Sequence, residues 1–441
     1  MTITSAQRNA MDVNPSQRYL VISADTHAVV PKEMFRPYVA QRYLAAFDEE
    51  VRRVDEERAA CRAGYRAYHD HRPEPTDEER YYHWNRAAEE AEAQRVWEPR
   101  NWIAMNESEG VVATVVFPAG SASRPPWEGF VLPVDDLDLR EEGKRVYNRW
   151  LAAFCGEFPD RLAGVALTPS LDDIASVVEM VRWTAESGLR GGIWISPTMS
   201  NDRAGFHDPV YDPIWAACQD HDLPINFHID FGGAPPAESR LYGASPLAWA
   251  VAFHDAPPTY RALWFFIFGG VFERFPRLKV GFTEQLARWI PYEVQRMEDV
   301  FHSKTFTSEN RLRAVRGVLS LSPREYWRRN CFVGASFMSR DEAAVRHEIG
   351  LETIMWGSDF PHPEGTTPVT REAIRYAFAD VPPDELRMIL GENAARVYHF
   401  DLSKLAPHAA RVGPTQDEVA RTLDAPPAEY PDKLAFGRGR F

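Results

Sequence analysis

Short runs of apolar and β-branched residues recur along the chain, and most of them are followed by an amphipathic stretch of helical length. Strands that alternate with helices indicate a parallel sheet with crossover connections. A doubly wound open sheet shares this alternation, but the number of repeats favours a closed (β/α)8 TIM barrel, an α/β fold. The eight predicted strands are Tyr19–Ala24, Val111–Phe117, Leu162–Leu167, Gly192–Ser196, Pro224–Phe227, Leu278–Phe282, Cys331–Ala335 and Thr353–Trp356.

Two stretches interrupt the alternation and set the predicted domain organisation. We expect the barrel to extend over residues 19–400 of the 441-residue chain, because α/β barrels of about 250 residues or more form single domains. Residues 41–110 are too many for a βα loop and are rich in Glu, Arg and Ala, which predicts a helical insertion after the first strand. The Pro- and Ala-rich residues 401–441 are predicted to form a C-terminal tail, packed on the barrel or extended from it.

The charge balance limits the partners. Asp and Glu number 64 against 50 Lys and Arg, a net charge of −14, which repels phosphate backbones and anionic lipid. Met1–Arg18 lacks the apolar core of a signal peptide, and the longest apolar stretch, Ala262–Phe272, is too short to span a bilayer. We therefore expect a cytoplasmic protein that acts on a small molecule, with no nucleic-acid or membrane partner.

Residues that can bind metals stand at the ends of four predicted strands. The carboxyl ends of barrel strands converge, so Asp25, His27, His228, Glu284 and Asp359 are expected to meet there. Asp25 and His27 are two residues apart and therefore point to the same side of an extended strand. Two imidazoles and three carboxylates exceed the needs of one metal ion with an open position, and they indicate two ions that share a carboxylate. This donor set suits iron or manganese better than zinc, although zinc also accepts His and Asp.

The motifs resemble those of the amidohydrolase superfamily, in particular the branch with the aminocarboxymuconate-semialdehyde and dihydroxybenzoate decarboxylases. The resemblance rests on Asp25-Thr26-His27, on His228 at a strand end, on Trp356-Gly357-Ser358-Asp359-Phe360-Pro361-His362 and on Gly391-Glu392-Asn393-Ala394-Ala395-Arg396-Val397-Tyr398. It covers residues from about Tyr19 to Phe400 and implies a metal-dependent (β/α)8 barrel. It also implies that Asp25 and His27 correspond to the first-strand His-x-His, with an acid in place of the first His, and that His228 and Asp359 are further ligands. Members with helical insertions are often dimers, which leaves a homo-oligomer open.

The sixth predicted strand departs from the decarboxylase pattern. Where decarboxylases of this branch carry a His, the chain reads Phe282-Thr283-Glu284. The resemblance assigns that His to proton transfer, so its absence argues against decarboxylation. In two-metal members the same position supplies a ligand to the second metal, which makes Glu284 the candidate ligand of a second ion.

Three reactions remain open, and the first hypothesis is a non-heme di-iron monooxygenase. In it Asp25, His27 and Asp359 hold one iron, and His228 with Glu284 holds the other. An aromatic content of 12% favours a bulky, largely apolar substrate. The second hypothesis is a hydrolase of amide or lactone bonds, with zinc or manganese and with Asp359 as general base. Decarboxylation ranks third.

The candidate catalytic residues are Asp359, Glu284 and His362. His362 follows Asp359 by three residues, so it can orient Asp359 or a water on the metal. A loop His hydrogen-bonded to the backbone is the equally weighted alternative.

Overall fold

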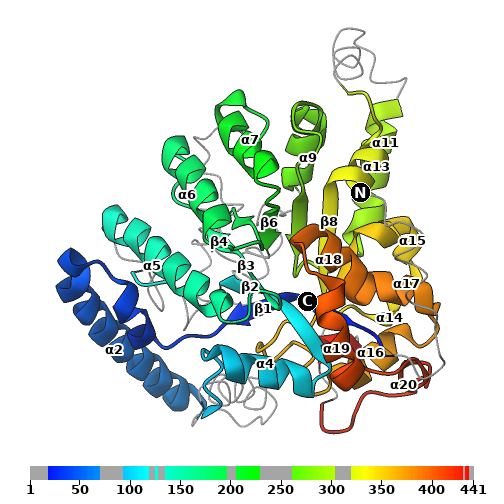
Figure 1. Ribbon diagram of the computed structural model, residues 1–441, viewed down its shortest axis with the longest axis horizontal. Coiled ribbons are helices and arrows are strands. Elements are labelled where there is room, and N and C mark those ends of the chain that lie inside the picture. Colours follow the sequence, from blue (N-terminus) through cyan, green and yellow to red (C-terminus); the bar gives the residue numbers. More distant parts are fainter. Residues whose placement is uncertain are drawn as a thin grey trace.

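A closed barrel of parallel strands forms the centre of the molecule (Figure 1). The computed structural model describes residues 18–69, 93–118, 125–127, 135–195, 205–228, 261–302, 319–430 and 433–436. Within these ranges the strands are β1 (Val21–Ala28), β2 (Val111–Pro118), β3 (Leu162–Gly164), β4 (Ala166–Leu167), β5 (Ile193–Trp194), β6 (Ile225–His228), β7 (Val280–Thr283), β8 (Cys331–Ser336) and β9 (Ile354–Gly357).

Hydrogen bonds across two seams close the barrel. The strands pair in the orders β1-β2-β3 and β4-β5-β6-β7-β8-β9. Val165 lies between β3 and β4, and its N–H donates to the Val116 carbonyl at 2.9 Å, so β3 and β4 are two halves of one barrel strand. At the other seam Thr26 of β1 pairs with Phe360, and the N–H of His27 donates to the Phe360 carbonyl at 2.7 Å. The predicted eight-stranded TIM barrel is confirmed.

The strands fall where the apolar runs predict them, with one informative difference. β1 continues to Ala28, so Asp25 and His27 lie within the strand rather than after it. Polar residues were expected to mark the end of this strand. They remain in it because β1 pairs with β2 and adjoins the segment after β9, and all residues of β1 are buried.

Helices surround the barrel, and α5, α6, α7 and α9 follow one another along its outside (Figure 1). Their order alternates with the strands, as crossover connections require. The helices are α2 (Leu44–His69), α4 (Pro99–Ser108), α5 (Leu137–Gly156), α6 (Ile174–Glu186), α7 (Asp212–Asp220), α9 (Arg261–Phe268), α10 (Val271–Arg274), α11 (Trp289–His302), α13 (Pro323–Asn330), α14 (Arg340–Ala344), α15 (Arg346–Ile349), α16 (Thr370–Phe378), α17 (Pro383–Arg387), α18 (Asn393–Tyr398), α19 (Leu402–Val412) and α20 (Gln416–Val419), with short 3-10 or π turns between some of them.

The insertion after β1 is helical in the part that the structure describes. Helix α2 lies at the periphery of the molecule, and α4 packs on β2 (Figure 1). Trp102 of α4 is fully buried, and its indole N–H donates to the Thr114 hydroxyl at 3.1 Å. This bond fixes α4 to the barrel wall. Residues 70–92 lie outside the described ranges, and the boundaries 19–400, 41–110 and 401–441 remain predictions.

Three neutral side chains near the N-terminal end of the barrel form hydrogen bonds with one another or with the backbone. The Tyr398 hydroxyl of α18 donates to Asn226 Oδ1 at 2.9 Å, and Asn226 Nδ2 donates to the carbonyl of Gly191 at 2.8 Å. Asn393 Nδ2 donates to the Leu351 and Ile354 carbonyls, both at 2.8 Å. These contacts account for the Asn and the Tyr of the sequence motif at residues 391–398.

The glycine of that motif, Gly391, has a steric role. A Cβ on Gly391 would lie 2.4 Å from the Leu20 carbonyl oxygen, so only glycine fits where this turn meets the start of β1.

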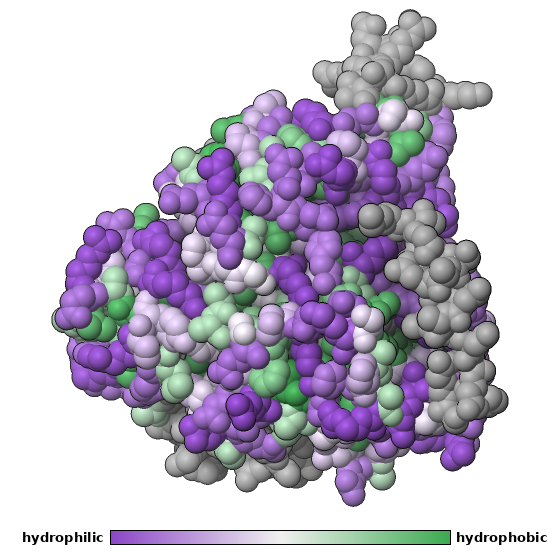
Figure 2. Space-filling view, viewed as in Figure 1, coloured by the Kyte–Doolittle hydropathy of each residue, from purple (hydrophilic) through white to green (hydrophobic). Residues whose placement is uncertain are grey.

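The described helices include none that is long and apolar enough to cross a membrane. The face in Figure 2 is mostly hydrophilic, with hydrophobic side chains in small separate patches.

Candidate active site

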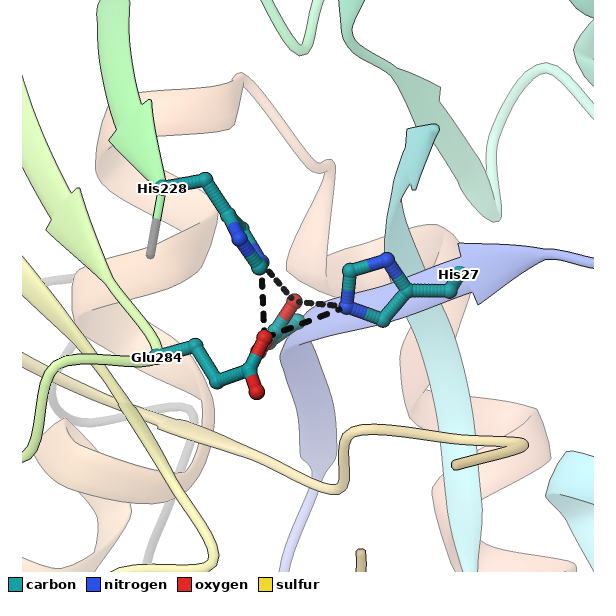
Figure 3. A group of neighbouring side chains, drawn as sticks. His27, His228 and Glu284 are labelled. Carbon is teal, nitrogen blue, oxygen red and sulfur yellow. Dashed lines mark hydrogen bonds and ion pairs between the residues drawn. The ribbon is translucent and has the colours of Figure 1, made fainter. Parts of the chain in front are cut away.

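Five predicted ligand residues converge at the C-terminal end of the barrel. Asp25 and His27 come from β1, His228 ends β6, Glu284 directly follows β7, and Asp359 follows β9. His27, His228 and Glu284 point toward one another in Figure 3. All five residues are buried, with exposed fractions from 0% to 8%. The convergence expected from the strand ends is therefore present in the structure.

Imidazole nitrogens and carboxylate oxygens face one another at short range. His27 Nε2 lies 3.4 Å from Asp25 Oδ1, 3.2 Å from Asp359 Oδ1 and 3.6 Å from Glu284 Oε2. His228 Nε2 lies 3.3 Å from both Asp25 Oδ1 and Glu284 Oε2. Asp25 and Glu284 thus both lie close to the two imidazoles, and Asp359 adjoins His27.

Two of these residues have an unusual backbone conformation. Glu284 has φ of 55° and Asp359 has φ of 57°, in the left-handed region that residues other than glycine seldom occupy. Each turn comes directly after a strand, where the Glu284 N–H donates to the Gly334 carbonyl at 3.2 Å and the Asp359 N–H to the Asp25 carbonyl at 2.9 Å. Such strain costs about 1–3 kcal/mol per residue and persists where the surroundings hold it, commonly at functional sites.

Further groups orient Asp25 and His27. The Ser336 hydroxyl at the end of β8 donates to Asp25 Oδ2, and the Ser23 hydroxyl donates to the Asp25 carbonyl at 2.7 Å. His27 Nδ1 lies 2.9 Å from the Pro118 carbonyl, so this nitrogen carries the proton and Nε2 faces the carboxylates. Ser336 directly follows the predicted strand Cys331–Ala335, but sequence reasoning gave it no role. Ser336 lies at the same end of the barrel as the predicted metal ligands, and this position was the signal in the sequence that could have pointed to it.

Burial and mutual charge shift the pKa values within the cluster. Burial raises the pKa of the Asp359 carboxyl to about 6 and also raises that of Glu284. For Asp25 burial acts in the same direction, but His228 and His27 outweigh it and hold its pKa well below the usual range. Burial would lower the pKa values of His27 and His228, yet nearby Asp25 raises both. In the metal-free chain the imidazolium charges therefore partly compensate the carboxylates.

The loop after β9 adds two groups. The His362 ring stacks on His27, with centroids 4.0 Å apart, and its Nδ1 lies 2.9 Å from Asp359 Oδ1. Burial, with His27 nearby, lowers the pKa of His362 to about 4, which keeps this ring neutral. Burial and Asp359 raise the pKa of Glu364 to about 7. Sequence reasoning missed Glu364, although it lies two residues beyond His362.

The donor set fits a divalent cation. Asp25, His27, His228 and Glu284 each offer a ligand atom, and these atoms lie within 4.8 Å of one another. His27 Nε2 and both Asp359 oxygens are buried and have no hydrogen-bond partner. An unsatisfied buried polar group costs about 1–3 kcal/mol, and a bound cation offsets part of this cost.

Within the described ranges the structure offers two overlapping groups of possible ligands rather than two separate ones. A second group, His27, Glu284, Asp359 and His362, overlaps the first at two residues. His27 has only Nε2 available because Nδ1 faces the Pro118 carbonyl, and one imidazole nitrogen binds one ion. The two groups therefore cannot each bind a separate ion through all four of their residues.

The chain matches known families and proteins. The Amidohydrolase family matches residues 25–400. The decarboxylase orsB of Emericella nidulans is 27% identical over 229 residues, 50% of this chain and 65% of that protein. The 2-amino-3-carboxymuconate-6-semialdehyde decarboxylase of Dictyostelium discoideum is 28% identical over 240 residues, 53% of this chain and 59% of that protein. Each match thus spans less than two thirds of the relative.

A solved structure has the same fold. It is a point mutant of 5-carboxyvanillate decarboxylase from Novosphingobium aromaticivorans, crystallised with manganese and 3-methoxy-4-hydroxy-5-nitrobenzoic acid. The structures align with a TM-score of 0.58 and 18% identity, and cover 88% of this chain and 99% of that one.

These relatives overturn the first functional hypothesis. They are decarboxylases, so the prediction of a di-iron monooxygenase, with the iron and the oxidative chemistry that it implied, is wrong. They do not favour the hydrolase alternative either, whereas decarboxylation, ranked third, fits them. The error came from treating Glu284 as decisive. A carboxylate in place of a His changes the donor atoms, but it does not by itself determine how many ions bind or which reaction follows.

Proposed function

We propose that this chain, which belongs to the amidohydrolase family, is a metal-dependent decarboxylase of an aromatic or otherwise unsaturated carboxylic acid. The observation that carries the proposal is a buried cluster of imidazoles and carboxylates in a chain whose curated relatives are decarboxylases. The substrate class follows the names of those relatives and of the manganese-bound structure.

We assign one divalent cation to Asp25, His27, His228 and Glu284. Manganese is the first choice, because the ligand atoms are carboxylate oxygen and imidazole nitrogen without a thiolate, and because the structural neighbour holds manganese. When bound, the cation supplies Lewis-acid attraction for the substrate carboxylate and an adjacent oxygen. Ser336 keeps Asp25 oriented through its hydrogen bond to Oδ2.

Asp359 is assigned to proton transfer. Cleavage of the bond between the substrate carbon and its carboxylate releases CO2 and leaves an electron pair on carbon, which must then take up a proton. The Asp359 carboxyl is buried, and its pKa of about 6 lets it hold a proton near neutral pH. His362 adjoins Asp359 Oδ1 and is held by its stack on His27, so it positions this carboxyl.

Glu284, which directly follows the sixth barrel strand (β7), is assigned to cation binding and not to proton transfer. Glu284 Oε2 lies 3.3 Å from His228 Nε2 and 3.6 Å from His27 Nε2, among the other proposed ligands of the cation. Proton delivery to carbon then depends on Asp359, and no His is required on this strand.

The test is CO2 release by the purified chain with Mn2+, measured on 5-carboxyvanillate, 2,6-dihydroxybenzoate and 2-amino-3-carboxymuconate-6-semialdehyde. We expect CO2 from at least one acid, at the same rate in air and under argon, with one solvent deuterium on the product carbon when the reaction runs in D2O. Oxygen consumption coupled to substrate, or no CO2 from any of the three acids, would contradict the proposal. The Asp359→Asn variant serves as the inactive control.

A further inference from the structure

A segment near the C-terminus reaches the end of the barrel that carries the candidate site. Lys433 precedes the 3-10 turn η8 (Leu434–Phe436), and its Nζ donates to the carbonyls of Pro363 at 2.5 Å and Thr367 at 2.6 Å. Both carbonyls belong to the loop between Asp359 and α16, which also carries His362. A single ammonium group thus joins two points of this loop.

The turn after Lys433 packs into an apolar cluster. Ala435 and Phe436 are buried together with Phe337, Val369 and Ala373, and the partly buried Leu286 and Tyr376 pack against this group. The Phe436 and Tyr376 rings meet edge to face, with centroids 5.3 Å apart.

The members of this cluster follow three barrel strands. Leu286 lies two residues after Glu284, Phe337 follows Ser336, and Val369 ends the loop that begins at Asp359. The cluster that contains Ala435 and Phe436 therefore includes residues of the loops that follow β7, β8 and β9. Each of these strands ends at or near a group of the candidate site, namely Glu284, Ser336 and Asp359.

These loops need external support because their backbones are strained. Besides Glu284 and Asp359, Leu286 has φ of 55° and Phe337 has φ of 41°. Left-handed conformations at residues other than glycine persist only where surrounding contacts hold them. Much of this packing comes from a segment that is distant in sequence, since Lys433 lies 70 residues after Pro363.

We propose that Lys433–Phe436 is a clamp that holds the three loops in the geometry required for cation binding, and that Lys433 is a positioning residue. The proposal rests on the proposed cation site. It assigns to the C-terminal segment a role in metal affinity, although none of its residues is among the proposed ligands.

The experiment compares full-length Lys433→Ala, Lys433→Arg and Lys404→Ala with the unchanged chain. Lys404 is the matched control, because its Nζ lies 2.7 Å from Asp160 Oδ1 near the start of β3, at the opposite end of the barrel. Two quantities are measured, the Mn2+ dissociation constant by competition with a chelator and hydrogen exchange of peptides covering residues 284–288, 336–339 and 361–369. Thermal unfolding shows whether each variant is folded.

We expect Lys433→Ala to weaken Mn2+ binding by about three- to tenfold, less than the 10- to 100-fold that loss of a direct partner of a metal ligand costs, and to speed hydrogen exchange in these peptides. Lys433→Arg should restore both, because a guanidinium also donates to two carbonyls, and Lys404→Ala should change neither. Phe436→Ala removes the ring that packs into the apolar cluster, and its effect on Mn2+ affinity and hydrogen exchange tests that contact in the same way. Unchanged exchange and unchanged Mn2+ affinity in a folded Lys433→Ala protein would overturn the clamp.

The two proposals fail in different ways. If the unchanged chain neither binds Mn2+ nor releases CO2, the proposed function and the role of the clamp in cation binding fall together. Hydrogen exchange of the three loops, compared between Lys433→Ala and the unchanged chain, still shows whether the clamp holds them. If the chain binds Mn2+ and releases CO2 while Lys433→Ala behaves like the unchanged chain, only the clamp is refuted.

Discussion

Two clusters of buried polar groups in the barrel differ in kind. At the N-terminal end Asn226, Asn393 and Tyr398 are neutral, and each forms hydrogen bonds of 2.8 to 2.9 Å. At the C-terminal end the groups are ionisable, and His27 Nε2 and both Asp359 oxygens are buried without a hydrogen-bond partner. One barrel thus combines a satisfied polar network with an unsatisfied one.

The two clusters are expected to contribute to different properties, one to the stability of the fold and the other to ligand binding or reaction. A satisfied buried network stabilises the fold, whereas buried polar atoms without hydrogen-bond partners cost free energy and are retained where a ligand or a reaction uses them. At the C-terminal end Glu284 and Asp359 also adopt left-handed backbone conformations. Substitutions at the two ends should therefore affect different measurements.

The largest expected effect is on activity. Asp359→Asn removes the proposed proton donor and should lower kcat by about 10²- to 10⁴-fold. The free energy of unfolding of the metal-free protein should stay equal or rise, because a buried charge near Asp25 is removed. Steady-state CO2 release and urea denaturation measure the two quantities. Asp160→Asn at the opposite end is the control, and a large loss of stability without loss of kcat would place Asp359 among the structural residues.

The next effect concerns metal affinity. Ser336→Ala deletes the hydroxyl that donates to Asp25 Oδ2 and should weaken Mn2+ binding about tenfold, since outer partners of metal ligands typically contribute 10- to 100-fold. Competition with a chelator measures the dissociation constant. Ser403→Ala, at an exposed helix start, serves as the control. Equal Mn2+ affinity in both variants would mean that Asp25 needs no support from β8.

A substitution at the N-terminal end should show the opposite pattern. Asn393→Ala leaves the Leu351 and Ile354 carbonyls without their donor and should lower the free energy of unfolding by about 1–3 kcal/mol. Mn2+ affinity should remain almost unchanged, because Asn393 contacts the starts of strands rather than their ends. Urea denaturation and chelator competition test both statements. A loss of metal affinity equal to that of Ser336→Ala would break the separation between the two ends.

A further effect is a pH dependence of stability in the metal-free chain. Burial raises the pKa of Asp359 to about 6 and that of Glu364 to about 7, and the pKa values of His27 and His228 are also raised. The folded state then holds more protons than the unfolded state between about pH 4 and 7. His362 opposes this because its pKa is lowered to about 4.

The pKa of Glu284 is raised as well, and that of Asp25 is lowered. With five groups raised and two lowered, stability should be greatest near about pH 4 and fall as the pH rises toward about 7. The slope is about 1.4 kcal/mol per pH unit for each net proton. Saturating Mn2+ should remove most of this loss. Urea denaturation at several pH values, with and without Mn2+, is the measurement, and a metal-free chain that gains stability over this range would show that the cluster binds fewer protons than inferred.

The sequence predicted the parts of the molecule that depend on local pattern. The apolar runs marked the barrel strands, and the two-residue spacing of Asp25 and His27 predicted that both side chains share one face. The convergence of His228, Glu284 and Asp359 followed from the parallel order of the strands. Ligand identity led to a first functional hypothesis that the relatives contradict, because the number of ions depends on distances and on the Pro118 carbonyl that engages His27.

The amino-acid sequence alone determined the barrel, its helical insertion and the five residues that meet at one end, because strand periodicity and chain order require only nearest neighbours along the chain. Only the tertiary structure decided which hydroxyl supports Asp25, that Glu364 adjoins the site, and that Lys433 reaches the loop of His362. These contacts join segments far apart in sequence. They depend on where the folded backbone brings each side chain, and that position has no signature in local composition.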